Sequence, residues 1–341
     1  MLVGIAHPIF LINDEGYYMI FLKPLSSQIL PILRAMKTVT LASGKSQPEA
    51  LALIEAFYQL FFTDIPLDFD NVSTISPAEL AEVPIEPSLR KHVLNGMAML
   101  ALVEGIPPKS QIVVLEEFAK AFGERSNLIE QIRSLSVSGV HQIIFSFARF
   151  RSTFLNSSIY VQVEQSGVYR TAKSLATTWG LVEDKALANR YAALATYPEG
   201  SLGLSLHHYY LQNKFALPGQ KLSLPEGIAS HDVSHLLSGY GVDYIGETLV
   251  AAFTAGYRYE ESAFFSSLLI ELMSLTNLMP SSRSPAACAS IFSQPGMAQR
   301  FLRALERGMK CKVDLFKDFN LWMVAHESIP ALCDRWGIEP E

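Results

Sequence analysis

Apolar side chains recur at helical spacing along most of this chain, and that repeat limits the possible folds more than any other feature. Residues 47–62 show it clearly, because Leu53, Phe57 and Leu60 lie three or four positions apart and would share one face of a helix. The same spacing predicts three more helices and a largely helical remainder, at 88–104, 109–123, 126–150 and 169–336. Alternating runs typical of strands are scarce, and the best one, at 158–163, stands alone. We therefore expect an all-α protein.

Two segments near the N-terminus interrupt this pattern. Residues 1–35 predict a short hairpin around a turn at 13–16, where Asn, Asp, Glu and Gly separate two apolar runs. Residues 63–88 are rich in Asp, Pro and Ser, which favours a loop with a short helix after Ser76.

The chain length and one further interruption suggest two domains. A chain of 341 residues is long enough for two hydrophobic cores. The polar residues at 156–158 break the helical pattern near the middle of the chain. We expect two helical domains, one at 1–150 and one at 151–341.

The composition excludes one class of partner and leaves others open. The net charge is −6 and no run of Lys or Arg occurs, whereas general nucleic-acid binding needs a basic surface. Hydrophobic residues make up 49% of the chain and charged residues only 18%. This favours an apolar ligand pocket, the interface of a homo-oligomer or contact with a membrane surface, and composition does not choose among them.

The sequence predicts a cytoplasmic protein, with contact at the inner membrane surface as an open alternative. Its three cysteines are widely spaced and form no CxxC motif, which fits a reducing compartment. The N-terminus lacks the basic region of a secretory signal. No apolar run is long enough to span a bilayer, since Glu271 and Asn277 interrupt the nearest candidate at 263–279.

The segment richest in chemically active side chains is HDVSHLLSGYGVDYIGE, residues 231–247. On a helix, His231 and His235 project from one face because they are four positions apart. Asp232 lies three positions before His235 and can turn toward the same side.

A second helix is expected to bring Glu247 back to this pair. Gly239 and Gly241 would end the first helix, and the next would begin near Asp243, whose ordinary role there is that of an N-cap. We predict one divalent metal, with four side chains as its ligands and as catalytic residues: His231, Asp232, His235 and Glu247. Two neutral imidazoles and two carboxylates balance the charge of such a cation and suit zinc or iron.

Other roles for these side chains stay open at this point. The four can form a hydrogen-bonded cluster without a metal, although two carboxylates in an apolar core favour a cation. Asp232 can instead accept a hydrogen bond from the histidine ring nitrogen that does not bind the metal, and so orient the ring. A protease is disfavoured, because HExxH proteases carry a Glu after the first His and Asp232 is one methylene shorter.

Residues 97–123, MAMLALVEGIPPKSQIVVLEEFAKAFG, resemble the helical hairpin of tellurite-resistance TerB-like domains. Those domains have an apolar helix, an acidic turn with Gly, and then an amphipathic helix that ends in Gly. The resemblance covers about sixty residues and implies a fold only. Relatives carry several acidic residues near the turn, whereas this chain keeps Glu104 and has Gln111 further on.

Residues 170–341 resemble the fourth coenzyme Q biosynthesis protein, here the Coq-four family. Three pieces carry the resemblance. They are PEGSLG at 198–203, the HDxxH motif followed after eleven residues by Glu247, and a tail in which IPAL at 329–332 leads to RWGI at 335–338. The first 150 residues have no counterpart in an ordinary member of the family.

This resemblance implies a role in ubiquinone (coenzyme Q) biosynthesis. The implied reaction is oxidative decarboxylation at ring carbon one of a prenylated aromatic precursor, with a divalent metal held by the motif. Zinc is the first choice and iron the alternative. The implied partners are a prenylated quinone precursor or another isoprenoid lipid, and other enzymes of quinone biosynthesis.

Whether the protein is an enzyme stays open. The high hydrophobicity favours a non-enzymatic scaffold that binds prenyl lipids and contains a structural metal. A phosphohydrolase of the HD type would need a further His and Asp at the metal, and the sequence offers no clear candidates.

Two neighbouring segments admit a ligand-binding role or a purely structural one. Gly200 and Gly203 can open a helix whose backbone N–H groups bind an anionic head group, or they can form an ordinary turn. The apolar residues of 251–273, among them Phe253 and Tyr257, can pack as a helix-pair core or line a groove for an isoprenoid tail.

Overall fold

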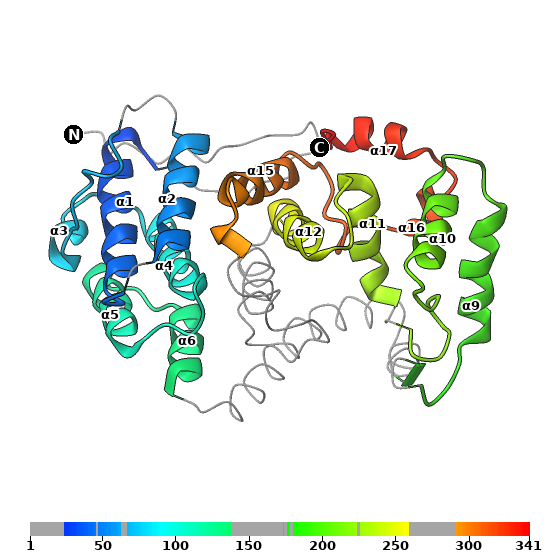
Figure 1. Ribbon diagram of the computed structural model, residues 1–341, viewed down its shortest axis with the longest axis horizontal. Helices are drawn as coiled ribbons and strands as arrows, with labels where there is room; N and C mark the ends of the chain where they lie inside the picture. Colours follow the sequence, from blue (N-terminus) through cyan, green and yellow to red (C-terminus); the bar gives the residue numbers. More distant parts are fainter. Residues whose placement is uncertain are drawn as a thin grey trace. The chain divides into compact units, whose positions relative to one another are not determined.

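The computed structural model describes residues 24–45, 47–62, 67–137, 180–223, 226–258 and 291–341, together with 173, 176 and 177 (Figure 1). These residues form helices and no strand, and the one extended pairing among them is an isolated bridge between Ser201 and Ser328. The all-α expectation is confirmed. The segment at 158–163 lies outside the described residues.

Contacts divide the chain into two compact units. The first comprises Met1–Arg149 and Tyr259–Leu305, and the second comprises Phe150–Arg258 and Glu306–Glu341. The sequence suggested a boundary near residue 150. It did not suggest that Tyr259–Leu305 belongs to the first unit, because a sequence pattern does not show contacts between distant segments. The second unit thus combines two separate stretches of sequence.

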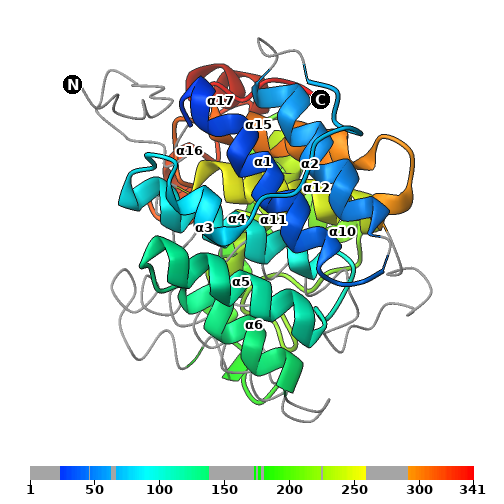
Figure 2. The ribbon, with the colours of Figure 1, turned by 90° about the vertical axis from the view of Figure 1, so that its left-hand side faces the viewer.

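The first unit is built around α1 (Ser26–Leu41), which packs against three other helices of similar length (Figure 2). These are α2 (Pro48–Phe61), α4 (Pro87–Leu102) and α5 (Lys109–Phe122). The short α3 (Pro77–Ala81) packs on α1 and α5, and α6 (Asn127–Val137) packs on α4 and α5. Fully buried side chains fill the centre, among them Leu33, Ile54, Leu94, Leu115 and Phe118.

The hairpin expected over residues 1–35 is wrong for the described part of that range. α1 begins at Ser26, because Ile29, Ile32, Leu33 and Met36 recur at helical spacing and all four are buried. Residues 1–23, with the expected turn, lie outside the described residues.

The short helix expected after Ser76 is present as α3. The Ser76 hydroxyl accepts a hydrogen bond from the N–H of Glu79, and the Glu79 carboxylate accepts one from the N–H of Ser76. This reciprocal pair satisfies two N–H groups that the helix start would otherwise leave without partners.

The turn that follows α4 holds a carboxyl group with a shifted pKa. Glu104 accepts hydrogen bonds from the backbone N–H groups of Glu49 and Ala50, in the first turn of α2. Burial, together with the hydrogen bond to the Glu49 carboxyl and its charge, raises the pKa of Glu104 to about 7. The Glu104 carboxyl therefore keeps its proton up to near-neutral pH.

The second unit is centred on α11 (Ala229–Ser238) and α12 (Tyr244–Tyr257), which pack together. α11 also contacts α10 (Leu202–Gln212) and α17 (Ile329–Trp336). The shorter elements of this unit are α9 (Lys185–Ala192), η1 (Ala193–Thr196), η2 (Glu226–Ile228) and α16 (Leu321–Val324). The first unit contains η3 (Ile291–Ser293).

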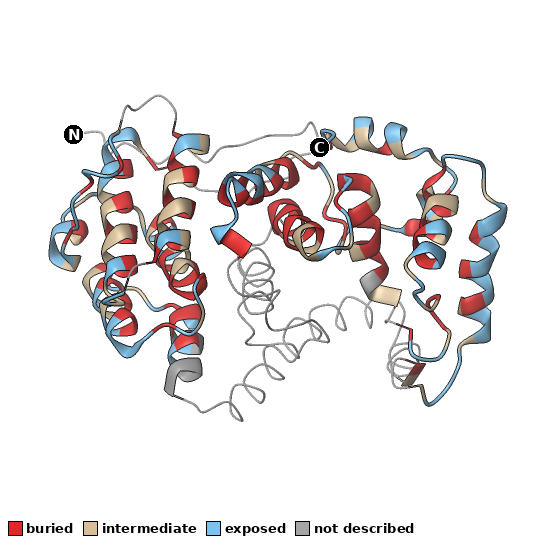
Figure 3. Ribbon diagram, in the orientation of Figure 1, coloured by how far each residue is buried: buried red, intermediate tan, exposed pale blue. Residues whose placement is uncertain are grey.

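The last turn of α15 (Met297–Met309) lies directly against α12. A Cβ atom on Gly308 would overlap the carbonyl oxygen of Phe253, so only glycine permits this approach. Most of α12 is buried, as Figure 3 shows. None of the helices in the described ranges is both long and apolar enough to cross a bilayer.

Candidate metal centre

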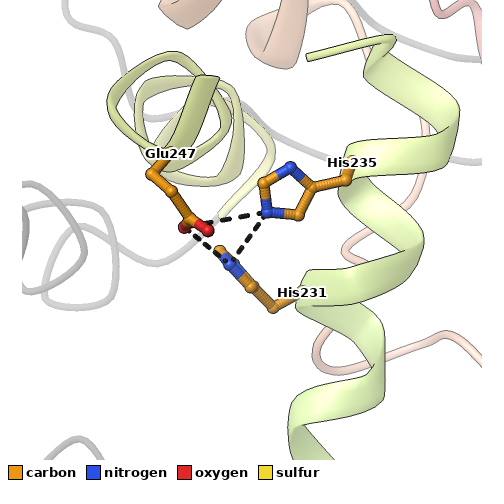
Figure 4. Close-up of side chains that lie close together, drawn as sticks. All are labelled: His231, His235 and Glu247. Carbon is orange, nitrogen blue, oxygen red and sulfur yellow. Dashed lines mark hydrogen bonds and ion pairs between the residues drawn. The ribbon is translucent and has the colours of Figure 1, made fainter. Parts of the chain in front are cut away.

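Two consecutive turns of α11 carry the histidines. His231 and His235 are four positions apart on this helix, and both rings point toward α12 (Figure 4). His235 is almost fully buried, with 2% of its side chain exposed, whereas His231 retains 28%. The helical expectation for this motif is confirmed.

A tight turn returns the chain from α11 to α12. Gly239 ends α11 with a φ of +82°, a conformation that glycine adopts without strain, and its N–H donates to the carbonyl of His235. Asp243 then caps α12, since its carboxylate accepts a 2.6 Å hydrogen bond from the N–H of Gly246. The N-cap expectation for Asp243 is confirmed, and Glu247 follows in the first turn.

The turn and the start of α12 touch backbone to backbone. A Cβ atom on Gly246 would overlap the carbonyl group of Gly241. Glycine at position 246 therefore holds the turn against the helix that carries Glu247.

Three side-chain atoms converge at the centre of Figure 4. The Nε2 atoms of His231 and His235 are 3.2 Å apart, and Oε2 of Glu247 lies 3.4 Å from the first and 3.7 Å from the second. A point in their plane equidistant from all three atoms lies about 2.0 Å from each, and zinc binds nitrogen and carboxylate oxygen at roughly 2.0–2.2 Å. Tetrahedral ligands at those lengths stand about 3.3–3.6 Å apart, close to the three distances between these atoms, so the triangle fits a metal ion.

A backbone carbonyl sets the tautomer of His235. Its Nδ1 lies 3.1 Å from the carbonyl oxygen of Tyr240, and a carbonyl only accepts, so in the neutral ring Nδ1 carries the proton. Nε2 then presents a lone pair toward His231 and Glu247. This is the arrangement in which a second partner fixes the ring and the other nitrogen binds a metal.

The carboxyl group of Glu247 is ionised in this setting. Burial raises its pKa, but when the rings of His231 and His235 are protonated, their hydrogen bonds and charges outweigh burial and hold the pKa well below its usual range. The cluster thus contains one carboxylate and two imidazoles.

Asp232, the fourth expected ligand, does not join this cluster. Successive residues on a helix point about 100° apart, and the carboxylate of Asp232 accepts a 2.7 Å hydrogen bond from the Tyr210 hydroxyl on α10. Both side chains are buried. Burial raises the pKa of Asp232, and the bond from Tyr210 opposes that rise. The structure brings together three of the four expected residues.

Two tyrosines of α10 complete the surroundings, and the sequence did not single them out. Tyr210 binds Asp232, and the Tyr209 ring lies 5.8 Å from the His235 ring, measured between centroids. Their adjacency in sequence was visible, but no spacing connects residue 210 with residue 232.

The PEGSLG segment forms a structural turn, and an anion site there is not supported. The N–H of Leu202 donates to the carbonyl of Glu327, and that of Gly203 donates to the carbonyl of Ala325. The Ser201 hydroxyl accepts from the next available N–H, that of Leu204. The N–H groups considered for an anionic head group are thus already used within the protein.

In its described part, the segment at 251–273 packs as core, the first of the two roles that the sequence left open. Phe253 and Tyr257 are fully buried, and their rings pack edge to face. The remainder of the 251–273 segment, from residue 259, lies outside the described residues.

Comparison with known proteins adds no relative, since no family model, no curated protein and no solved structure matches this chain. The chemistry of the centre therefore follows from its own geometry. Catalytic zinc sites typically have three protein ligands and structural sites four. The three converging side chains, of which His231 and Glu247 are partly exposed, match the catalytic type in number.

Proposed function

We propose that His231, His235 and Glu247 bind one divalent metal, zinc in the first instance and iron as the alternative. The convergence of three ligand atoms at tetrahedral spacing carries this proposal. The tautomer imposed on His235 by Tyr240 supports it, because the imidazole nitrogen facing the centre has a lone pair.

The exclusion of Asp232 from the ligand set has an electrostatic consequence. Two neutral imidazoles and one carboxylate leave a divalent cation with a net charge of about +1, whereas a second carboxylate would neutralise it. The centre would therefore attract an anionic ligand through the partly exposed edge formed by His231 and Glu247.

We further propose that this ligand is the carboxylate or phenolate of a prenylated aromatic ring, as the similarity to the Coq-four family suggests. The reaction would be oxidative decarboxylation at ring carbon one in ubiquinone biosynthesis. The bond from the ring to the carboxyl carbon breaks as carbon dioxide leaves, and a bond from the ring to oxygen forms. This is a two-electron oxidation of the substrate: dioxygen accepts the two electrons and two protons and leaves as hydrogen peroxide, and water supplies the oxygen of the new hydroxyl group. A bound metal would stabilise the negative charge of the substrate.

Metal content by plasma mass spectrometry tests the site. Wild type should retain about one equivalent of zinc or iron, His235→Ala should lose it, and Asp232→Asn should keep it because Asn can still accept from Tyr210. Wild type without metal, or loss of metal in Asp232→Asn alone, contradicts the three-ligand site.

Turnover tests the reaction. Metal-loaded protein, supplied with dioxygen and a short-chain prenylated hydroxybenzoate, should release carbon dioxide and form the ring-hydroxylated product in equal amounts. Glu247→Gln should abolish both, whereas an exposed change such as Arg303→Lys should not.

A prenyl-lipid scaffold for other quinone biosynthesis enzymes is the second candidate, and exposed apolar side chains favour it. Leu181 and Leu222 are 68% and 73% exposed in the second unit, and Leu222 lies against Gly180, so the two leucines are close together. Metal-dependent binding of a prenylated lipid without any turnover would support the scaffold. Turnover by the purified protein alone would exclude a purely structural role.

A further inference from the structure

Arg307, in the last turn of α15, is a buried cation whose hydrogen bonds end on backbone carbonyls. Its side chain is covered, with 7% of the residue exposed. The guanidinium donates a 2.9 Å hydrogen bond to the carbonyl of Ser238, the last residue of α11. It also donates to the carbonyl of Glu339, by a 3.0 Å bond from Nε and a second, shorter bond from Nη2.

The same guanidinium lies over the ring of Tyr240. The distance from its central carbon to the ring centroid is 4.9 Å, within the range of a cation–π contact. The N–H of Tyr240 faces the Ser238 hydroxyl at 3.4 Å. Arg307 therefore contacts the turn at 238–240 at two points: the carbonyl of Ser238 and the ring of Tyr240.

That turn supplies the acceptor that fixes His235. The carbonyl of Tyr240 accepts from Nδ1 of His235, and its position decides which ring nitrogen keeps the lone pair. A shift of this carbonyl would free the ring to adopt the other tautomer, with a proton on the nitrogen that faces His231 and Glu247.

We propose that Arg307 is a positioning residue for the metal centre. It links the backbone carbonyl of Glu339 to the turn that sets the His235 tautomer. This inference rests on the proposed metal site. Arginine is required because its planar group donates in several fixed directions and stacks on a ring, and lysine, with its compact ammonium, cannot match both. Gly308 keeps Arg307 in place, since it lets α15 approach the backbone of α12.

The first experiment reads the tautomer without any metal. Nitrogen-15 NMR of histidine-labelled, metal-free protein should show His235 with its proton on Nδ1, the signal being assigned by its loss in His235→Gln. In Arg307→Lys the proton should shift, wholly or in part, to Nε2. An unchanged tautomer in a folded Arg307→Lys protein overturns the proposal.

The second experiment measures zinc affinity by competition with a chelator. Arg307→Lys should bind zinc about 10–100-fold more weakly, the usual effect of removing support from a ligand. Arg303→Lys, an exposed change one turn earlier on α15, should bind as wild type does. Affinity within twofold of wild type in Arg307→Lys refutes the positioning role.

A chain that ends at Ile338 gives a second variant should Arg307→Lys fail to fold. It lacks the Glu339 carbonyl but keeps every ligand, and it should show a change of tautomer and affinity in the same direction. Full wild-type behaviour in this variant removes the C-terminal link. Wild type that binds no zinc refutes the metal site itself, whereas the tautomer comparison still decides whether Arg307 controls His235.

Discussion

Replacing Tyr210 with Phe should destabilise the second unit, because it removes the donor that Asp232 needs. The bond is a 2.7 Å contact from a hydroxyl to a carboxylate, and both side chains are buried. Water therefore cannot easily take the place of the lost hydroxyl. Hydrogen bonds to charged groups contribute about 1.5–3 kcal/mol, and an unsatisfied buried acceptor costs a similar amount, so we expect a loss of about 2–3 kcal/mol in the free energy of unfolding.

Tryptophan fluorescence during urea unfolding can isolate this effect. The chain has three tryptophans, Trp179, Trp322 and Trp336, and all fall within the second unit. The measured transition therefore reports the unit that contains Tyr210 and Asp232. Zinc content should stay at about one equivalent, because neither residue belongs to the ligand triangle.

A double-mutant cycle separates the bond from general damage. We expect a coupling energy of about 1–3 kcal/mol from the cycle of Tyr210→Phe, Asp232→Asn and the double variant. Tyr209→Phe is the control, because it removes the same hydroxyl group at the adjacent position. If the free energy of unfolding of Tyr210→Phe lies within about 0.5 kcal/mol of the wild-type value, or if the coupling is near zero, the bond from Tyr210 to Asp232 does not stabilise the second unit.

Three further predictions concern other parts of the chain. The pKa of Glu104 is raised from 4.5 to about 7 by burial and by Glu49. Its contribution to stability is therefore complete below pH 4.5 and is lost as pH rises through 7. The thermal midpoint of the first unit, followed by circular dichroism, should fall over that pH range in wild type and much less in Glu104→Gln. Gly246→Ala should destabilise the second unit by roughly 1–3 kcal/mol and lower its zinc content, because the new methyl group overlaps the backbone of Gly241. A urea unfolding curve, followed by tryptophan fluorescence, that equals the wild-type curve would contradict this. Glu247→Gln should lose bound metal while keeping its helical circular dichroism, and retention of a full equivalent would show that the carboxylate is not a ligand.

The residues that the sequence placed correctly are those governed by local rules. The four-residue spacing of His231 and His235 fixes their common face once α11 forms, and Asp243 precedes α12 as an N-cap should. Glu247 follows because a short turn with Gly239 reverses the chain. Each of these predictions needs only a few neighbouring residues.

The residues that the sequence misplaced or missed depend on packing between distant segments. Asp232 faces Tyr210 because α10 happens to lie on that side of α11, and nothing within residues 231–247 encodes this. Arg307 and Ser238 are 69 positions apart, and the acceptors of Arg307 are backbone carbonyls, which every residue has. A sequence pattern cannot distinguish one carbonyl from another.

The division of the second unit into two stretches of sequence determines the order in which its parts become available during synthesis. All three converging side chains have been synthesised once residue 247 has been translated. Arg307 and Glu339 follow only after Tyr259–Leu305, a segment that belongs to the other unit. At about 5–20 residues per second, translation of that remainder takes on the order of ten seconds. A nascent chain therefore displays His231, His235 and Glu247 before the guanidinium that steadies their turn exists. The hydrogen bonds that join Arg307 to Ser238 and Glu339 can therefore form only later in synthesis than the segment that carries the triad.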